Sequence, residues 1–372
     1  MQATKPPRIA FFVSSHGFGH AARACAVMQS LRRLRPDSEL RVYTETPAWF
    51  FRDSVGEVDY RSLRTDIGLV QRSPMLEDIP ATLEQLAAFM PFRPALVDEL
   101  ARQILDRDLV VCDIAPLGLS VAAAAGVPSV LLENFTWDWI YRAYRDEYPG
   151  LAPYVDAMAA LNDRADVHVQ AKPVCRPDPA AITVDPVARQ LRETRSAVRN
   201  RLGVAPDMPL VLVSMGGVPA QYPFLPRLRD RRDCVCLLPG AATERRREGA
   251  LLALPVRSDF YHPDLVNACD ALVCKAGYST LAEALQAGVP LAWFPRERFP
   301  ESPVLDAFIE QEMPGIRLQP SDWDDGAWVD HLPPLLALGR RPPAVTRGAD
   351  QVARLLLHQI EGGSANRVGP GG

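Results

Sequence analysis

Two histidines and two glycines lie within five residues near the N-terminus, a combination that suits acid–base chemistry. The run is Ser15-His16-Gly17-Phe18-Gly19-His20, and it joins an apolar stretch to an amphipathic one. Gly17 and Gly19 allow a tight turn that brings backbone amides close to a ligand. An imidazole that faces a cleft is a natural general base near pH 7. We therefore expect this pair of histidines to supply a base. The alternative is that His16 packs against the loop and His20 caps the helix.

A carboxylate that would orient this base follows a second apolar run. Asp113 comes directly after the stretch 109–112, so it should lie at the carboxyl end of a strand, on the same rim as the histidine loop. A carboxylate that accepts from the far ring nitrogen fixes the tautomer of a histidine and stabilises the imidazolium. We expect Asp113 to be the residue that orients the base. The alternative role for Asp113 is to cap the helix that follows.

Two segments in the second half of the chain have the composition of phosphate-binding turns. Ser214-Met215-Gly216-Gly217 follows an apolar run, and its glycines supply flexible backbone. The stretch from Lys275 to Glu283 joins another apolar run to a helix, where hydroxyl groups accompany the first-turn amides. The residues that we expect to line the phosphate site are Gly216, Gly217, Lys275, Gly277, Ser279 and Thr280.

Three further charged residues could contact a ligand that is held at this phosphate site. Glu283 lies one helical turn after Ser279, where its carboxylate could accept from both hydroxyls of a ribose. The alternative is a capping-box acid, because Thr280-x-x-Glu283 fits that pattern. After a further apolar run, Arg296 would neutralise phosphate and Glu301 would hold sugar hydroxyls.

The elements that must position these residues alternate along the chain. We expect strands at 9–14, 40–44, 109–112, 129–132, 210–214, 234–238, 271–274 and 291–294, and helices at 20–34, 116–125 and 279–287. Gly126-Val127-Pro128 and Gly288-Val289-Pro290 repeat one pattern, a glycine that ends a helix before a proline that opens a strand. Continuously apolar strands predict an α/β protein with two doubly wound, parallel, Rossmann-like sheets. Ligands then belong at the carboxyl ends of the strands, facing a cleft between the domains.

The alternation breaks once, in a proline-containing, charge-rich stretch, and this break sets the expected domain boundaries. We expect an N-terminal domain over 1–171, a linker over 172–195 and a C-terminal domain over 196–345. A helix over 346–360 would follow, with the option of packing back on the N-terminal domain. The glycine-rich stretch 361–372 is expected to be a disordered tail.

Composition narrows the function classes. The 372 residues carry a net charge of −4, which argues against a nucleic-acid-binding protein. No segment reaches the roughly 18 uninterrupted apolar residues of a membrane span, although peripheral membrane contact stays open. A polar N-terminus and seven cysteines without zinc-site spacing predict a cytoplasmic protein with buried thiols. Asp322-x-Asp324 matches a metal motif but lies in a polar loop, so we expect no metal or other cofactor.

These motifs together resemble a known family. His16–Arg23 and Gly277–Leu285 look like the corresponding segments of GT-B glycosyltransferases of the MurG and UDP-glycosyltransferase kind. A narrower likeness, over residues 8–315, is to the glycosyltransferase-like region of plant L-arabinokinase and its stand-alone bacterial relatives. Two positions depart from the pattern. Ala-Ala-Arg follows His20, and Glu301-Ser302 stands where plant enzymes have an acidic residue followed by glutamine.

The resemblance implies an enzyme that moves a sugar from a nucleotide-sugar donor, UDP-linked, to an acceptor hydroxyl with inversion and without a metal. It assigns the base to His20, its support to Asp113 and the ribose contact to Glu283. It also places the stacking of uridine near the segment Arg257–His262, which includes Phe260. Two alternatives stay open, since fold alone does not guarantee chemistry. One is an epimerase or hydrolase that acts on the nucleotide sugar, and the other is a non-catalytic protein that binds it.

Overall fold

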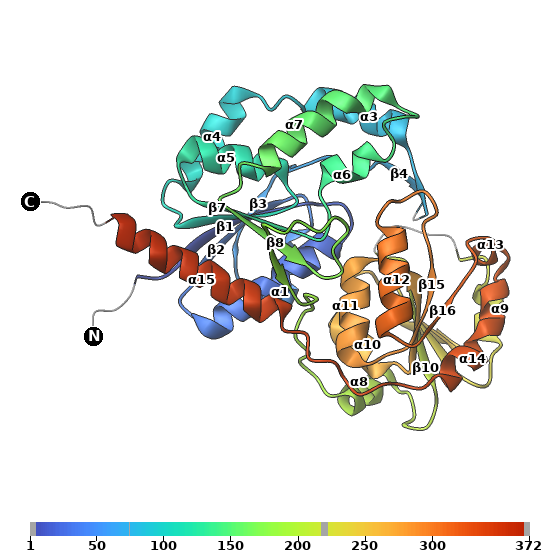
Figure 1. Cartoon of the computed structure of the whole chain (residues 1–372). Helices are drawn as coiled ribbons and strands as arrows, with labels where there is room; N and C mark the ends of the chain where they lie inside the picture. Colours follow the sequence, from blue (N-terminus) through green and yellow to red (C-terminus); the bar gives the residue numbers. More distant parts are fainter. Residues whose placement is uncertain (1–4, 74, 217–221, 368–372) are drawn as a thin grey trace, which may run out of the picture. The chain divides into compact units, whose positions relative to one another are not determined.

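The computed structural model describes residues 5–73, 75–216 and 222–367, with side chains as far as residue 362 (Figure 1). Its internal contacts divide the chain into two compact units. The first comprises Met1–Val70, Asp78–Arg189 and Arg347–Gly372, and the second comprises Gln71–Glu77 and Gln190–Thr346.

The first unit is built on a seven-stranded sheet in which every strand pair is parallel. The spatial order is β3 (Asp59–Ser62), β2 (Glu39–Thr44), β1 (Arg8–Val13), β6 (Leu109–Asp113), β7 (Ser129–Glu133), β8 (Val167–Ala171) and β9 (Ile182–Val184). The order of the strands reverses between β1 and β6, where Val13 is in register with Asp113. Ligands of open α/β sheets bind at such a reversal, outside the carboxyl ends of the strands.

Helices cover this sheet because most crossovers between its parallel strands return through one, the connection from β8 to β9 being the exception. They are α1 (Gly19–Leu34), α2 (Ala48–Val55), α3 (Ile79–Phe89), α4 (Pro94–Ile104), α5 (Pro116–Ala125), α6 (Trp137–Arg142), α7 (Ala152–Asn162) and α15 (Gly348–Arg367), with a 3₁₀ turn at Pro149–Leu151. The last helix, α15, packs along α1, and Arg33 pairs with Asp350 at 2.6 Å (Figure 1). The C-terminal end of the chain therefore completes the first unit.

The second unit repeats the architecture with a second seven-stranded sheet. Its order is β12 (Arg246–Glu248), β13 (Leu251–Leu254), β11 (Val235–Pro239), β10 (Leu210–Ser214), β14 (Ala271–Lys275), β15 (Leu291–Phe294) and β16 (Gly315–Arg317). All pairs are parallel except β12 with β13. Along β10, Leu210 and Leu212 join one hydrophobic cluster while Val211 and Val213 join another. The strand is thus buried on both faces, which explains its continuous apolar sequence.

The helices of the second unit are mostly short. They are α8 (Arg195–Leu202), α9 (Leu225–Arg229), α10 (His262–Ala268), α11 (Tyr278–Ala287), α12 (Ser302–Glu312), α13 (Asp322–Asp325) and α14 (Leu332–Ala337), with a 3₁₀ turn at Ala327–His331. Among the helices of the described residues, none is both long and apolar enough to cross a membrane.

The predicted fold class is confirmed, since both sheets are parallel and doubly wound except at one edge. The predicted ranges of α5, β10 and β15 match the structure residue for residue. The two expected helix ends are confirmed as well: Gly126 and Gly288 adopt the left-handed conformation with φ of 65° and 67°. A glycine reaches that conformation without the steric cost that a Cβ would bring.

The division into units departs from the expected boundaries at three places. Residues 172–189 belong to the first unit, because β9 pairs with β8. The hairpin of β4 (Gln71–Ser73) and β5 (Leu76–Glu77) belongs to the second unit, where Met75 packs on a core cluster and Glu77 lies 3.3 Å from Arg298. The last helix continues to Arg367, through most of the stretch expected to be a disordered tail.

Candidate functional site

The histidine loop lies at the carboxyl end of β1, next to the point where the strand order reverses. Gly17 has a φ of 69°, which turns the chain into α1. The N-cap of α1 is Phe18 and makes no side-chain capping bond, so His20 does not cap the helix. His20 lies instead in the first turn with 7% of its surface exposed. A small accessible portion of the ring is what a base needs to reach a substrate.

Asp113 ends β6 and meets the base directly. The Nδ1 of His20 lies 3.0 Å from the Oδ1 of Asp113, and both side chains are buried. A carboxylate at Nδ1 selects the tautomer that carries its proton there, which leaves Nε2 as the acceptor. The N-cap of α5 is Ala115, so Asp113 does not cap that helix. The structure therefore brings the two expected members of the dyad together in the geometry that a general base requires.

Arg23, which the sequence analysis named at the end of the histidine motif without assigning it a role, completes the cluster. Arg23 is 1% exposed, and its guanidinium donates from Nε to Asp113 Oδ2 at 2.8 Å and from Nη2 to Asp113 Oδ1 at 2.6 Å. Its Nη1 donates to the Oδ1 of Asn134 at 2.6 Å, just beyond β7. Burial by itself would raise the pKa of Asp113, but the charge of Arg23 and the bonds from His20 and Arg23 lower it below the ordinary value. Asp113 is thus an anion at neutral pH.

The backbone beside Asp113 is strained. Ile114 has a φ of 48°, a conformation that a β-branched side chain rarely adopts, and it is buried. Such a residue costs about 1–3 kcal/mol and persists only where the surrounding structure holds it, most often at functional sites. The strained residue, Ile114, follows Asp113 directly in the chain.

His16 occupies a different environment from His20. Its Nδ1 accepts a 3.4 Å hydrogen bond from the amide of Leu69, and its ring meets the indole of Trp137 edge-on with centroids 5.1 Å apart. A Cβ added to Gly68 would lie 2.8 Å from that same Nδ1, so the segment packs tightly on the imidazole. His16 therefore packs against the adjoining loop, as the alternative interpretation proposed for this residue.

A second buried carboxyl lies in the same region. Asp66 is 3% exposed, and its Oδ1 accepts from the Ser14 hydroxyl at 3.1 Å. Burial raises the pKa of Asp66 to about 7, against the opposing effect of the bond from Ser14. Asp66 carries no local motif, and only the packing of distant segments reveals it. The sequence did contain a signal for Arg23, because a residue three positions after His20 on a helix lies on the same face of that helix.

The ribose-binding candidate lies in the second unit. Glu283 on α11 is 2% exposed, and its Oε2 is 3.1 Å from the Nδ1 of His262 at the start of α10. The helix begins at Tyr278 with Gly277 as N-cap, so Thr280 stands inside the helix. A capping box with Thr280 as the cap is therefore not formed. Ser279 is also buried, in the first turn of the same helix.

A cluster of charges surrounds the carboxyl ends of β14 and β15. A Cβ added to Gly216 would lie 3.1 Å from Cε of Lys275, so the glycine allows the lysine to approach the loop after β10. Burial, and then the charge of Arg296, lowers the pKa of Lys275 to about 7, while Glu301 opposes the shift. Arg296 donates to Glu301 at 3.2 Å, and its guanidinium lies 3.4 Å from the ring centroid of Phe299. The structure thus pairs the two residues expected to bind phosphate and sugar separately.

Two other expected positions stand apart from this cluster. Gly217 lies outside the described residues. Phe260 is 8% exposed within a core cluster, and the guanidinium of Arg201 lies 4.3 Å from its ring centroid. No group of three or more metal-ligating side chains occurs among the residues that the structure describes.

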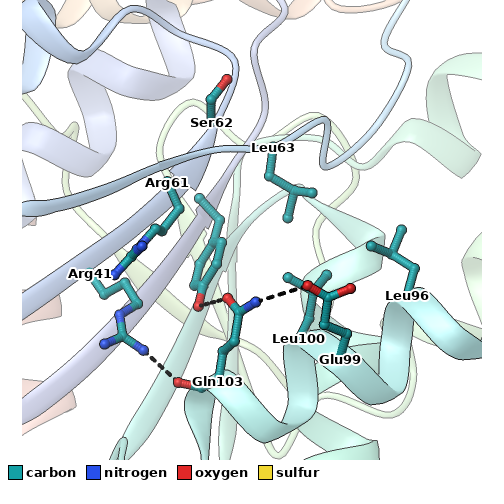
Figure 2. Close-up of a pocket in the computed structure, with 9 residues that line it drawn as sticks. Arg41, Arg61, Ser62, Leu63, Leu96, Glu99, Leu100 and Gln103 are labelled. Carbon is teal, nitrogen blue, oxygen red and sulfur yellow. Dashed lines mark hydrogen bonds between the residues drawn. The ribbon is translucent and has the colours of Figure 1, made fainter.

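A pocket of about 530 Å³ opens elsewhere in the first unit (Figure 2). Strands β2 and β3 and helix α4 line it, through Arg41, Tyr43, Arg61, Ser62, Leu63, Leu96, Glu99, Leu100 and Gln103. Its two arginines are both paired with Asp59, Arg41 at 2.6 Å and Arg61 at 2.9 Å. None of the expected site residues lines this pocket, and Asp59 already neutralises part of the charge of its two arginines.

Comparison with known proteins agrees with this architecture. No family model matches the chain. The chain is 31% identical to the L-arabinokinase of Arabidopsis thaliana over 336 residues, which is 87% of this chain but 31% of that protein. It is 24% identical over 292 residues to the UDP-N-acetylglucosamine--N-acetylmuramyl-(pentapeptide) pyrophosphoryl-undecaprenol N-acetylglucosamine transferase of Limosilactobacillus fermentum, covering 74% of this chain and 75% of that one.

Solved structures show the same fold. The glycotransferase of kitacinnamycin superposes with a TM-score of 0.62 at 15% identity, covering 96% of this chain and 100% of that one. A UDP-glucosyltransferase from Polygonum tinctorium gives a TM-score of 0.59 at 14% identity, covering 98% and 95%. With two seven-stranded, largely parallel sheets and these similarities along nearly its whole length, the chain belongs among the proteins with the GT-B glycosyltransferase fold.

Proposed function

We propose that this chain is a glycosyltransferase that moves a sugar from a UDP-linked donor to an acceptor hydroxyl with inversion. The observation that carries the proposal is the contact between His20 and Asp113 at the reversal point of the first sheet. In that arrangement the Nε2 of His20 removes the proton of the acceptor hydroxyl. The acceptor oxygen then forms a bond to the anomeric carbon as the bond from that carbon to the diphosphate breaks. The nucleotide diphosphate departs with the electron pair.

The second unit supplies groups that suit the donor. Lys275 and Arg296 would stabilise the charge that develops on the departing diphosphate, together with amides at the start of α11. Glu283 would accept from the ribose hydroxyls, and its contact with His262 would orient the carboxylate. This distribution of roles leaves no step that requires a metal. The name of the similar transferase of Limosilactobacillus fermentum contains UDP-N-acetylglucosamine, which favours a uridine nucleotide.

The experiment is a thermal-shift screen of nucleotide sugars followed by product analysis. A ligand specific for the folded state stabilises it by RT ln(1 + [L]/Kd), about 2.7 kcal/mol at 100 times Kd. The stabilising donor is then incubated with candidate acceptors, and the anomeric configuration of the product is read by NMR. Inverted glycoside supports the proposal. Consumption of donor without acceptor indicates an epimerase or hydrolase, and binding without any consumption indicates a non-catalytic protein.

We also place the protein in the cytoplasm. All seven cysteines are free thiols, and only Cys175 is not buried. Unpaired cysteines of this number suit a reducing compartment. Fractionation of the native cells with an antibody to the chain would test this placement.

A further inference from the structure

The pocket of the first unit has the size of a small-molecule site and lies between the sheet and helix α4 (Figure 2). Its volume of about 530 Å³ falls within the roughly 300–1,000 Å³ that ligand pockets occupy. On the sheet side, Arg41 is in register with Asp59, and Tyr43 with Arg61, across β2 and β3. Residues that stand opposite each other, or two positions apart along a strand, project from the same face of a sheet. These four side chains therefore share the face that borders the pocket.

The sheet side of the pocket keeps a net positive charge. The Nε atoms of Arg41 and Arg61 lie 2.6 and 2.9 Å from the two oxygens of Asp59, so two guanidinium groups share one carboxylate. Burial alone would raise the pKa of Asp59, but the bonds and charges of both arginines hold it below the ordinary value. Asp106 lies 3.9 Å from Arg41 but also pairs with Arg107. One positive charge is therefore left for a ligand.

An apolar wall completes the pocket. Leu100 belongs to a core cluster of the first unit, and Leu96 packs on that cluster while its side chain stays half-buried. Leu63, just after β3, packs on the same cluster. The core thus holds the three leucines in place, and all three contribute to the lining of the pocket. An apolar chain that covers such a surface binds up to about fourfold more tightly for each methylene group.

A carboxylate on α4 limits the charge that the ligand can carry. Glu99 accepts at 3.4 Å from the side-chain amide of Gln103, whose own oxygen accepts from Tyr43 at 3.2 Å. The backbone carbonyl of Gln103 accepts from Arg41. Figure 2 shows Gln103 between Arg41 and Glu99, so charges of opposite sign stand at different ends of the pocket. A second anionic group on the ligand would face Glu99 and be repelled.

We propose that this pocket binds a small monocarboxylate with an apolar chain, whose carboxylate lies against the two arginines and whose chain covers the three leucines. A guanidinium matches the planar geometry of a carboxylate and can bind it through two bonds. A phosphate monoester carries about −1.5 to −2 charges, more than the one positive charge left on the sheet side. The lining of the pocket, as far as the structure describes it, includes none of the residues assigned to the transfer reaction. The site is therefore separate from the proposed function and does not rest on it.

The test is a titration with hexanoate, followed through the leucine methyl signals in NMR spectra of the whole chain. The signals of Leu63, Leu96 and Leu100 are each assigned by their absence in the corresponding isoleucine variant. We expect these signals to shift in a saturable way. The dissociation constant should fall from acetate through butanoate to hexanoate, by up to about fourfold per methylene group. Adipate, which has a second carboxylate at the far end, and inorganic phosphate should both bind more weakly than hexanoate.

Two substitutions with opposite expected effects assign the charges. Arg61→Gln should weaken hexanoate binding about three- to tenfold, less than for a buried charge-assisted bond because the Arg61 side chain is 56% exposed. Glu99→Gln removes a like charge and should tighten binding slightly. Both positions are exposed, so we expect both variants to fold. The matched control is Arg52→Gln, an exposed arginine of α2 that pairs with Glu57 and should leave binding unchanged.

Four results would overturn the proposal. The first is that the three leucine signals do not move at about 10 mM hexanoate, a concentration that detects even a millimolar dissociation constant. The second is that hexanol binds as tightly as hexanoate, because the arginines would then have no role. The third is that phosphate binds as tightly as hexanoate, because the leucines would then have no role. The fourth is an equal loss in Arg61→Gln and Arg52→Gln, which would assign the effect to the overall charge of the protein.

Discussion

Replacing Asp113 by asparagine tests the buried cluster most directly. The substitution keeps the size and shape of the side chain and removes one negative charge. It takes the carboxylate away from the buried guanidinium of Arg23, whose Nη1 still donates to Asn134. It also removes the preference of the His20 ring for a proton at Nδ1. We therefore expect both the free energy of unfolding and the reaction rate to fall, each for its own physical reason.

The structure sets the size of each effect. Breaking a buried ion pair by removing one partner costs about 3–5 kcal/mol, and the bond to Asn134 places this case near the lower end. In the folded protein the pKa of Asp113 is below its ordinary value. The ionised carboxylate therefore stabilises the fold fully at any pH above the ordinary pKa of aspartate. This stabilisation is lost as the pH falls through the lower, folded value. The rate should drop about 10²- to 10⁴-fold, because the base is no longer held in the correct tautomer.

The assay is guanidinium unfolding at several pH values, with hydrogen exchange of the β6 peptide to report on the first unit. The matched control is Asp66→Asn, for which we expect a change in stability of the opposite sign. Burial raises the pKa of Asp66 to about 7, so the wild type loses stability as the pH rises from about 4 to about 7. Asp66→Asn avoids that loss and should be more stable than wild type at pH 8, by at most about 4 kcal/mol. An Asp113→Asn variant as stable as wild type at pH 7 would refute the ion-pair reasoning.

Three further predictions concern the proposed reaction. Glu283→Ala should weaken UDP binding about 10- to 150-fold in calorimetry, because it loses a charge-assisted hydrogen bond of roughly 1.5–3 kcal/mol. UDP binding near pH 7.5 should take up a proton, because the pKa of Lys275 is about 7 and a diphosphate beside it would raise that value; calorimetry in two buffers of different ionisation enthalpy measures the uptake. His20→Ala should lower turnover about 10²- to 10⁴-fold while UDP affinity stays near wild type.

Each of these has a control. Unchanged UDP affinity in a folded Glu283→Ala variant would restrict that residue to its contact with His262. Proton uptake that persists in Lys275→Met would assign the proton to another group. His16→Ala is the control for His20→Ala, since His16 packs on the neighbouring segment and its loss should be milder. Greater damage from the His16 variant would move the base to the first histidine.

Several features of this protein follow from local sequence. Strands such as Leu210–Ser214 are apolar without interruption because the sheet buries both of their faces, and that pattern is visible in any window of the chain. Gly126 and Gly288 end their helices in the left-handed conformation, which is a local steric requirement, and at Gly288 the backbone of Arg341 adds a second, non-local one. The meeting of His20 with Asp113 was predictable as well, since the carboxyl ends of parallel strands share one edge of a sheet.

Other features depended on tertiary contacts. Residues 172–189 looked like a linker but add a strand to the first sheet, because β8 offers them an open edge.

The charge balance of the cluster is the clearest case. Arg23, Asp113 and Asn134 come from three elements, separated by up to 111 positions in the sequence. Hydrophobic periodicity depends on neighbours within a few positions, so sequence alone indicates which face of a helix is buried. The strength of a charge pair depends on which partners share its buried site and on how little water reaches them, and only the folded chain decides both.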